Sequence, residues 1–164
     1  MKIIDDKVFF YTNYFSNFHR CKFQDPSTEI IFPTTEHAFM WFKARFFDDH
    51  NSMSRLKLMF DAHPQAAKQV GRSVANYDDV RWECVRFGYM VYANYLKYSQ
   101  NQELKEKLLA TGDKTLVEAS PVDLIWGIGL AESEPNEVLA DVSNWKGRNL
   151  LGKALMRVRD LVTV

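Results

Sequence analysis

An acidic and a basic residue stand seven positions apart in a segment rich in large apolar side chains. Glu36 and Lys43 fall within residues 36–47, a run without Gly or Pro that is rich in Phe, Met and Trp. In an α-helix this spacing puts the two side chains within about 20° of each other around the axis and about 10 Å apart along it. They therefore share a face but do not readily pair directly.

Two opposite charges on one face of a buried helix can hold a polar ligand between them. Burial also lowers the pKa of a lysine, which makes a neutral and nucleophilic amine available. The alternative is structural: Glu36 and Lys43 lie on the exposed edge of the helix, or they satisfy backbone groups. Their spacing alone leaves both interpretations open.

The sequence shows no pattern typical of a metal centre or a catalytic thiol. His37 stands beside Glu36, where a histidine is more often a structural hydrogen-bonding residue, and no His/Cys cluster accompanies it. Cys21 and Cys84 form no CxxC motif and are expected to be reduced. We therefore expect no metal and no redox cofactor.

A glycine-containing loop lies near two acidic residues. Trp126-Gly127-Ile128-Gly129 resembles the start of a dinucleotide-binding fingerprint, but Glu132 stands where the third Gly is required and no βαβ pattern surrounds it. The glycines are expected to let the backbone approach a ligand closely or to make a tight bend. Glu118 and Asp123 are candidates for a general acid or base beside an aromatic ring, or are simply solvated.

Two turns that contain arginine are candidate phosphate sites. Residues 147–152 lead into a helix, with Asn149 as a candidate N-cap and Arg148 beside it, and helix N-termini near an arginine bind phosphate well. An ordinary capped helix is the alternative. Gly71 and Arg72 follow a helical segment. The preferred interpretation is that the glycine is a C-cap, and the alternative is that the arginine binds an anion.

The elements that position these residues follow from apolar periodicity and from turn residues. Helices are expected at residues 36–47, 52–60, 64–70, 80–98, 101–110 and from 150 onward. Extended segments are expected at 7–11 and 114–118 and in a hairpin that joins 21–24 to 29–32. Residues 125–130 are expected to be a Gly-broken strand or loop, and residues 131–147 mainly loop. This predicts a helix-dominated α+β fold with a small antiparallel N-terminal hairpin or sheet.

Length, charge and hydropathy exclude several classes of protein. A chain of 164 residues fits one domain over residues 1–164, at roughly 100 to 200 residues per domain. Lys plus Arg equals Asp plus Glu at 21 each, which gives no support to broad electrostatic binding of nucleic acid or of a membrane surface. No apolar run approaches the ~20 residues of a membrane span and no signal-peptide pattern is seen, so we expect a cytoplasmic protein with no membrane partner. Aromatic residues are 14% of the chain, and some are expected to line a pocket that stacks a flat ligand.

Several short motifs occur in a characteristic order along the chain. They comprise residues 15–18, 32–39, Lys43, 71–72, Trp82, 108–112, 116–121, Asp123, 126–129 and 149–152. Together they resemble the NADAR family, the YbiA-like N-glycosidases named for a proposed link to NAD and ADP-ribose. The likeness covers roughly residues 8–161.

The resemblance implies hydrolysis of the bond between ribose C1 and a base nitrogen. The implied partner is a small molecule, a phosphoribosylamino-pyrimidine intermediate of riboflavin synthesis, or an ADP-ribosylated guanine in nucleic acid. Each carries a phosphorylated ribose joined through nitrogen to a flat heterocycle. The alternatives are a catalytically silent ADP-ribose or NAD binding module, and a structural or interaction protein.

The resemblance also implies roles for individual residues. Lys43 is the motif lysine that attacks C1 of the ring-opened ribose as a Schiff base, and Glu36 moves a proton or holds the ribose hydroxyls. The tryptophans would stack the base, the arginines and the turn from 147 to 149 would bind phosphate, and the remaining residues would complete the polar shell. The substrate-binding residues implied in this way are Asn17, Arg72, Trp82, Glu118, Asp123, Trp126, Gly127, Gly129, Arg148 and Asn149.

Overall fold

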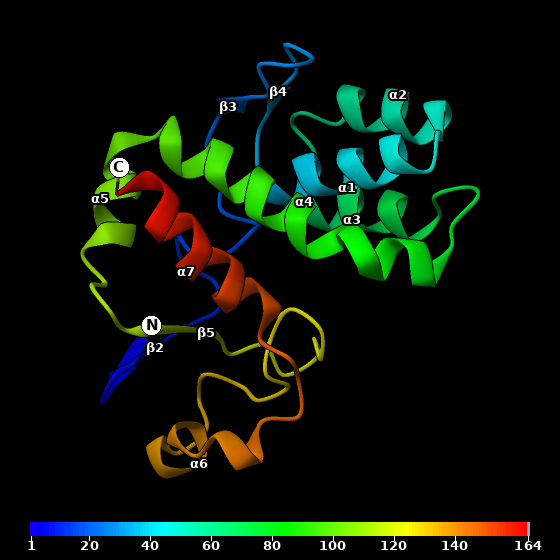
Figure 1. Cartoon of the computed structure of the whole chain (residues 1–164). Helices are drawn as coiled ribbons and strands as arrows, with labels where there is room; N and C mark the ends of the chain where they lie inside the picture. Colours follow the sequence, from blue (N-terminus) through cyan, green and yellow to red (C-terminus); the bar gives the residue numbers. More distant parts are fainter. Residues whose placement is uncertain (164) are drawn as a thin grey trace. The chain divides into compact units, whose positions relative to one another are not determined.

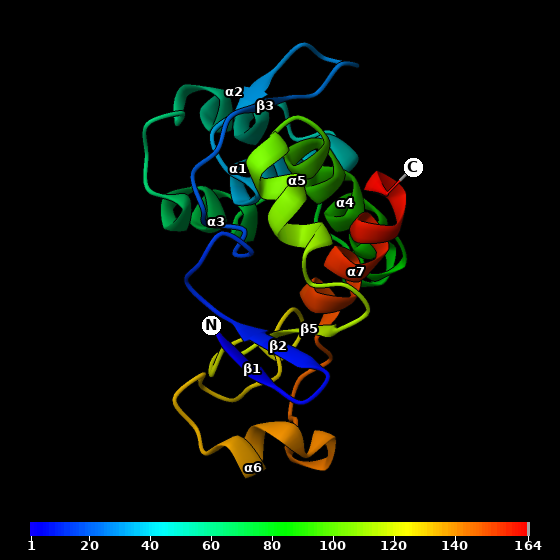
Figure 2. The same cartoon turned by 90° about the vertical axis from the view of Figure 1, so that its left-hand side faces the viewer.

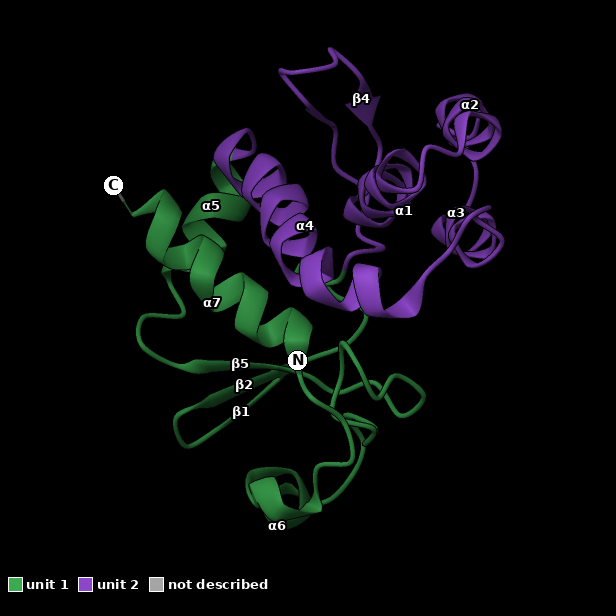
Figure 3. Ribbon diagram, turned by 45° about the vertical axis from the view of Figure 1, so that its right-hand side comes forward, with its two compact units in different colours: residues 1–16, 102–164 green, residues 17–101 purple. Residues whose placement is uncertain are grey.

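The computed structural model describes residues 1–163 and divides into two compact units (Figure 3). Unit 1 comprises residues 1–16 and the chain from residue 102 onward, and unit 2 comprises residues 17–101. Helices dominate and the strands are short (Figure 1), which confirms the predicted α+β class. Within residues 1–163 no helix is long and apolar enough to cross a membrane.

Unit 1 is built on a three-stranded sheet in the order β1-β2-β5. Its strands are β1 (Lys2–Ile4), β2 (Lys7–Phe10) and β5 (Thr115–Glu118). β1, a strand not predicted from the sequence, is antiparallel to β2, whereas β5 runs parallel to β2. The sheet is therefore mixed. The parallel pairing of β2 and β5 requires a long crossover connection, which residues 11–114 supply.

The helices of unit 1 cover both faces of this sheet. They are α5 (Gln102–Leu109), α6 (Asn136–Ala140), the 3-10 turn η1 (Val142–Asn144) and α7 (Leu150–Val162). α7 packs against β5 on one face, whereas α6 lies beyond the other face (Figures 2 and 3). Phe9, Val117 and Leu139 belong to the core on the α6 side, and Trp145 packs against it. The expectation of mainly loop over residues 131–147 was wrong for α6 and η1, because this short segment closes that core.

Unit 2 consists of a hairpin and a group of helices around α1. The hairpin pairs β3 (Phe23–Gln24) with β4 (Ile31–Phe32) in antiparallel register, as predicted. The helices are α1 (Thr35–Phe46), α2 (His50–Leu58), α3 (Pro64–Arg72) and α4 (Asp79–Ser99). α1 packs against each of the other three, which explains why nine of its twelve residues are buried.

Side-chain caps determine where the helices of unit 2 begin. The side chain of Thr34 accepts the amide of His37 at 3.2 Å, and Asp49 and Asp78 cap α2 and α4 in the same way. The amide of Glu36 donates to the carbonyl of Asn17 at 3.0 Å. Glu36 is thereby placed in the first turn of α1.

Candidate functional site

The two residues that carry the catalytic prediction both lie on α1. Residues 35–46 form a continuous helix, so Glu36 and Lys43 share a face as their spacing predicts. Glu36 is only 5% exposed, so the alternative that places both side chains on an exposed edge is wrong for this residue. Lys43 is partly buried.

The ammonium group of Lys43 is held between a backbone carbonyl and two aromatic rings. Its Nζ donates to the Gly71 carbonyl at 2.8 Å and lies 4.3 Å from the centroid of the Tyr77 ring. The ring of Trp82 lies 5.8 Å away. The carbonyl and the faces of the rings attract a cation and fix the position of the side chain. Lys43 does satisfy a backbone group, as the structural alternative proposed, but it does so inside an aromatic cluster.

Gly71 has a different role from the one its sequence position suggested. It lies within α3, and Ser73 is the C-cap, so the prediction of a C-cap glycine was wrong. A Cβ at this position would lie 1.8 Å from the sulfur of Met40 on α1. The missing side chain therefore lets α3 approach α1 closely, which puts the Gly71 carbonyl within reach of Lys43.

Two features of the surroundings of Lys43 shift the pKa of its ammonium in opposite directions. Burial lowers the pKa of the ammonium below its ordinary value, and the negative charge of Asp79 acts against this shift. The Tyr77 hydroxyl donates to the Asp79 carboxylate at 2.7 Å and keeps it beside the cluster. The net effect is a lysine that loses its proton at lower pH than a solvated one. Tyr77 and Asp79 were missed in the sequence, where they signal only the start of a helix.

Trp82 is part of the packed interior of unit 2. It is 5% exposed, lies 5.4 Å from the ring of Phe39 and stacks on Tyr89 at 5.7 Å with an angle of 20° between the planes. Its stacking partner in this structure is thus a tyrosine of the same helix. The ring forms one wall beside Lys43.

Asn17 adjoins Glu36 and is fixed to α4. It is 7% exposed, and its carbonyl accepts the Glu36 amide. Its side-chain Nδ2 donates to the sulfur of Met90 at 3.3 Å, and its Oδ1 accepts from Asn94 at 3.3 Å. The predicted polar residue is therefore bonded through its backbone to the backbone of Glu36, and Asn94 is a neighbour that the sequence did not reveal.

His37 is a structural hydrogen-bonding residue, as its sequence context indicated. Its Nε2 donates to the carbonyl of Met59 at 3.1 Å, so its Nδ1 accepts the hydroxyl of Thr34 at 2.8 Å. Burial lowers the pKa of the imidazole, and the nearby charges of Arg20 and His63 lower it further. The neutral ring ties the start of α1 to the segment after α2.

The last of the predicted residues in unit 2 lies at its surface. Arg72 is the final residue of α3, directly after Gly71, and is exposed. The structure thus gathers Asn17, Glu36, Lys43 and Trp82 around α1 and places Arg72 at the end of the neighbouring helix.

In unit 1 the loop after β5 is shaped by Asp123. Its Oδ1 accepts the amides of Ile125 at 3.0 Å and Trp126 at 2.7 Å. These two bonds orient the turn that carries the partly buried Trp126 ring. Asp123 is therefore a loop-forming residue in this structure, beside the predicted stacking residue.

The two glycines of this loop allow a bend and a close contact. Gly129 has a φ of +71°, which confirms the predicted tight bend. A Cβ on Gly127 would lie 2.8 Å from the Cβ of Ser120 and 3.0 Å from the carbonyl of Glu118. The close approach that Gly127 permits is thus to the end of β5 within the chain itself.

The amides at the start of α7 do not form an anion site. The N–H groups of residues 148–151 all donate to carbonyls of residues 124–127, at 2.9 to 3.1 Å. The prediction that the turn from 147 to 149 binds phosphate through its backbone was wrong, because these donors are already used. The Arg148 side chain is exposed and stays a candidate.

Asn149 stands at the N-cap position but does not cap α7. Its φ is +52°, and its side chain makes no capping hydrogen bond. Instead its Nδ2 donates to the carbonyl of Leu116 at 2.9 Å and its Oδ1 accepts the amide of Glu118 at 3.0 Å. The capping prediction was wrong because the side chain forms hydrogen bonds with the backbone of β5, as a neighbouring strand would.

Within residues 1–163 no group of three or more His, Cys, Asp or Glu side chains is arranged to hold a metal ion.

A model of the NADAR domain matches residues 9–163, almost the whole chain. The chain belongs to the NADAR domain family. N-glycosidase R617 of Acanthamoeba polyphaga mimivirus is 40% identical to this NADAR protein over 128 residues, which are 77% of this chain and 72% of that protein. Riboflavin biosynthesis protein VVA0006 of Vibrio vulnificus is 29% identical over 163 residues, which cover 96% of this chain but 39% of that protein.

A solved structure supports the same conclusion. The NMR structure of E. coli YbiA has a TM-score of 0.75 and 28% identity to this NADAR chain, and the alignment covers 98% of this chain and 88% of that one. The resemblance read from the short motifs is confirmed.

Proposed function

We propose that this NADAR protein hydrolyses the N-glycosidic bond between a phosphorylated ribose and a flat base, with Lys43 as nucleophile and Glu36 as proton carrier. Its family and its N-glycosidase relatives make the chain a hydrolase of N-glycosyl compounds. The observation that carries the residue assignment is the position of Lys43, partly buried with a lowered pKa on the same helix face as a buried carboxylate.

The proposed reaction uses the neutral amine of Lys43. The Nζ lone pair forms a bond to ribose C1 while the C1–N bond breaks, and its electron pair leaves with the base, which takes up one proton. The amine loses a proton and the ribose ring opens to an imine. Water then hydrolyses the imine, so the net change is one water consumed and the free base and free sugar released. Glu36 lies on the same face of α1 as Lys43, and we assign to it the delivery and recovery of this proton.

The substrate that we propose carries a phosphoribosyl or ADP-ribosyl group on a base nitrogen. The name of the Vibrio vulnificus relative supports a pyrimidine intermediate of riboflavin synthesis, and ADP-ribosylated guanine has the same linkage chemistry. In unit 1 we retain as proposals a stacking role for Trp126 and, for an ADP-ribosyl substrate, binding of the second phosphate by the Arg148 side chain. Glu118 and Asp123 stay as proposed polar contacts.

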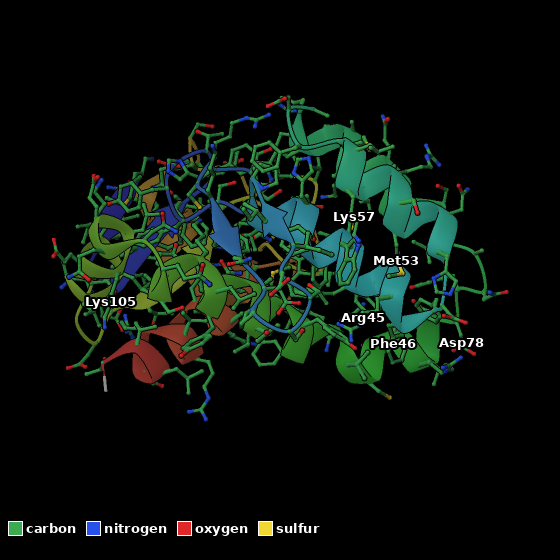
Figure 4. The ribbon with its side chains drawn as sticks, turned by 90° about the horizontal axis from the view of Figure 1, so that it is seen from above. Arg45, Phe46, Met53, Lys57, Asp78 and Lys105 are labelled. Atoms are coloured by element: carbon green, nitrogen blue, oxygen red, sulfur yellow. The ribbon has the colours of Figure 1, made fainter. Side chains whose placement is uncertain are left out.

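Base release from the two candidate substrates tests this function. The wild type should release base from a phosphoribosylamino-pyrimidine or from an oligonucleotide with ADP-ribosylated guanine, and Lys43→Ala should abolish release. Lys57→Ala is the matched control, because Lys57 is an exposed lysine on α2 (Figure 4) and should keep full activity. Saturable binding of ADP-ribose without release of either base would refute the proposed N-glycosidase activity and favour a catalytically silent binding module.

A second experiment tests the covalent step directly. Borohydride added during turnover should reduce the imine and leave the sugar attached to Lys43, which intact-mass and peptide mass spectrometry detect. An unmodified mass during active turnover would exclude the imine mechanism.

A further inference from the structure

Helix α4 carries a buried arginine on the side where it packs against the rest of unit 2. Trp82, Arg86, Met90 and Asn94 follow at intervals of four residues and are all buried, so they form one stripe that turns only about 40° per step. Arg86 is 7% exposed. Arginine is almost never this buried without a partner, so its position requires an explanation.

The ends of this stripe adjoin the two residues that we propose as catalytic. Trp82, one turn before Arg86, lies beside the ammonium of Lys43. At the other end Asn94 donates to Asn17, whose carbonyl accepts the amide of Glu36. Arg86 therefore lies on α4 between the residues that contact the Lys43 end and the Glu36 end of α1.

A second observation relates Arg86 to the cluster around Lys43. Its positive charge acts on the hydroxyl of Tyr77, the ring that lies against the Lys43 ammonium, and lowers the pKa of that phenol. Burial and the hydrogen bond to Asp79 outweigh this effect and raise the pKa of Tyr77 to about 12. Arg86 is thus within electrostatic reach of the proposed reaction centre.

The guanidinium of Arg86 is far from fully used within the protein. One NH2 group donates to the Glu83 carboxylate at 3.0 Å, and among residues 1–163 this is its one hydrogen-bonding partner. The Glu83 side chain is 50% exposed and belongs to the same helix, one turn earlier. A guanidinium has five donors in a planar fork that fits two oxygens of a carboxylate or a phosphate. Glu83 therefore accepts one hydrogen bond from the guanidinium, which has further N–H donors for a second anionic ligand.

We infer that Arg86 binds the phosphate attached to the ribose of the substrate and that Glu83 holds the guanidinium in position before the ligand arrives. This inference rests on the proposed function, because it takes the ligand to be a phosphorylated ribose. Arg86 stands one turn after Trp82, whose ring lies beside the Lys43 ammonium, so a phosphate bound by Arg86 fits a ligand that also reaches Lys43. Arg72, one of the two arginines predicted from the sequence to bind phosphate, is by contrast exposed at the end of α3.

Binding of two unreactive sugars tests the inference without any turnover. Methyl ribofuranoside 5-phosphate and methyl ribofuranoside have a blocked C1, so neither can form an imine with Lys43. By calorimetry the wild type should bind the phosphorylated sugar at least about 10-fold more tightly, because charge-assisted hydrogen bonds are this strong. Arg86→Gln should remove this preference while binding of the unphosphorylated sugar is unchanged, and Arg55→Gln, an exposed arginine on α2, should keep it.

Two further variants keep the test sharp if Arg86→Gln does not fold. Arg86→Lys retains the charge but loses the fork, so the preference should fall part of the way. Glu83→Gln keeps an amide oxygen that can accept from the guanidinium and hold it in position, but it removes the negative charge that competes with a phosphate. Affinity for the phosphorylated sugar should therefore rise several-fold with no change for the other sugar, which a damaged fold cannot produce. Equal binding of both sugars by the wild type, or an undiminished preference in Arg86→Gln, would overturn the inference. A preference for phosphate that depends on Arg86 in a protein that releases no base would uphold the inference and overturn the glycosidase.

Discussion

At the scale of single residues, the chemistry of Lys43 depends on a balance between burial and polar contacts. The Gly71 carbonyl and the Tyr77 ring stabilise the ammonium and fix its position, as does the charge of Asp79. Removal from water favours the neutral amine and outweighs these contacts, so the pKa is lowered. At a given pH a larger fraction of Lys43 is therefore the neutral, nucleophilic amine than of a solvated lysine.

Replacing Asp79 by asparagine should shift the acidity of Lys43. The variant loses the nearby negative charge that favours the ammonium, so the pKa of Lys43 should fall further. Since the neutral amine is the reactive form, the rising limb of the pH–rate profile should move to lower pH. The measurement is kcat against pH for wild type, Asp79→Asn and the exposed Asp113→Asn as control. A limb that stays in place or moves to higher pH would contradict the assignment.

Replacing Glu36 by glutamine should remove proton transfer but retain the shape of the side chain. We expect turnover to fall by roughly 10² to 10⁴, because this is the usual contribution of a positioned general acid or base. The melting temperature should change little, since the amide can keep the buried position. Activity close to wild type would show that Glu36 only binds or packs, and a chain that no longer folds would favour the structural alternative.

At the scale of elements, the contact of α7 with β5 explains why a loop and a helix start have fixed shapes. A Cβ on Gly152 would lie 2.0 Å from the carbonyl of Leu116, so the first turn of α7 packs directly on the strand backbone. Asn149 adds two hydrogen bonds to the same strand from a left-handed backbone conformation. Asparagine suits this position because it tolerates positive φ and carries both a donor and an acceptor.

Asn149→Ala should destabilise unit 1 markedly. It leaves the carbonyl of Leu116 and the amide of Glu118 without their side-chain partners and adds strain at positive φ, for a total of roughly 2 to 4 kcal/mol. Asn149→Gly is the matched comparison, because it loses the same bonds without the strain and should cost about 1 kcal/mol less. Urea unfolding of both variants gives the two values. Equal stability of Asn149→Ala and wild type would refute the role of the side chain.

At the scale of the whole molecule, the protein has a formal net charge of zero, and at least one of its cationic side chains is buried. Lys and Arg together equal Asp and Glu at 21 each. Lys97 on α4 is fully buried, and burial lowers the pKa of its ammonium to about 8, against the opposing influence of Cys21. Because the pKa in the folded state is below the ordinary value of 10.5, the folded protein binds fewer protons than the unfolded chain between these values.

The contribution of Lys97 to the stability should therefore rise with pH between these values. For Lys97 the expected gain between pH 7 and 9 is about 1 kcal/mol, as the cost of a buried ammonium disappears. Urea unfolding of wild type and Lys97→Met at several pH values measures this contribution together with its coupling to Cys21, since Lys43 and the remaining titrating groups are common to both proteins. Parallel pH profiles of the two proteins would show that Lys97 does not titrate as inferred.

The sequence by itself determined the features that depend on neighbouring residues. Apolar periodicity and turn residues predict α1 and α4, because helices are organised within one or two turns. The shared face of Glu36 and Lys43 follows from helix geometry alone. The order of short motifs was enough to indicate the family.

Only the tertiary structure decided which partners these residues have. The Gly71 carbonyl lies 28 residues from Lys43, and Asn149 meets β5 across more than thirty, so no local pattern could assign either contact. The buried Arg86 looks in the sequence like any polar residue on a long helix. Its burial and position became evident only when α4 was packed against the rest of unit 2, because packing, not sequence spacing, determines which face of a helix loses contact with water.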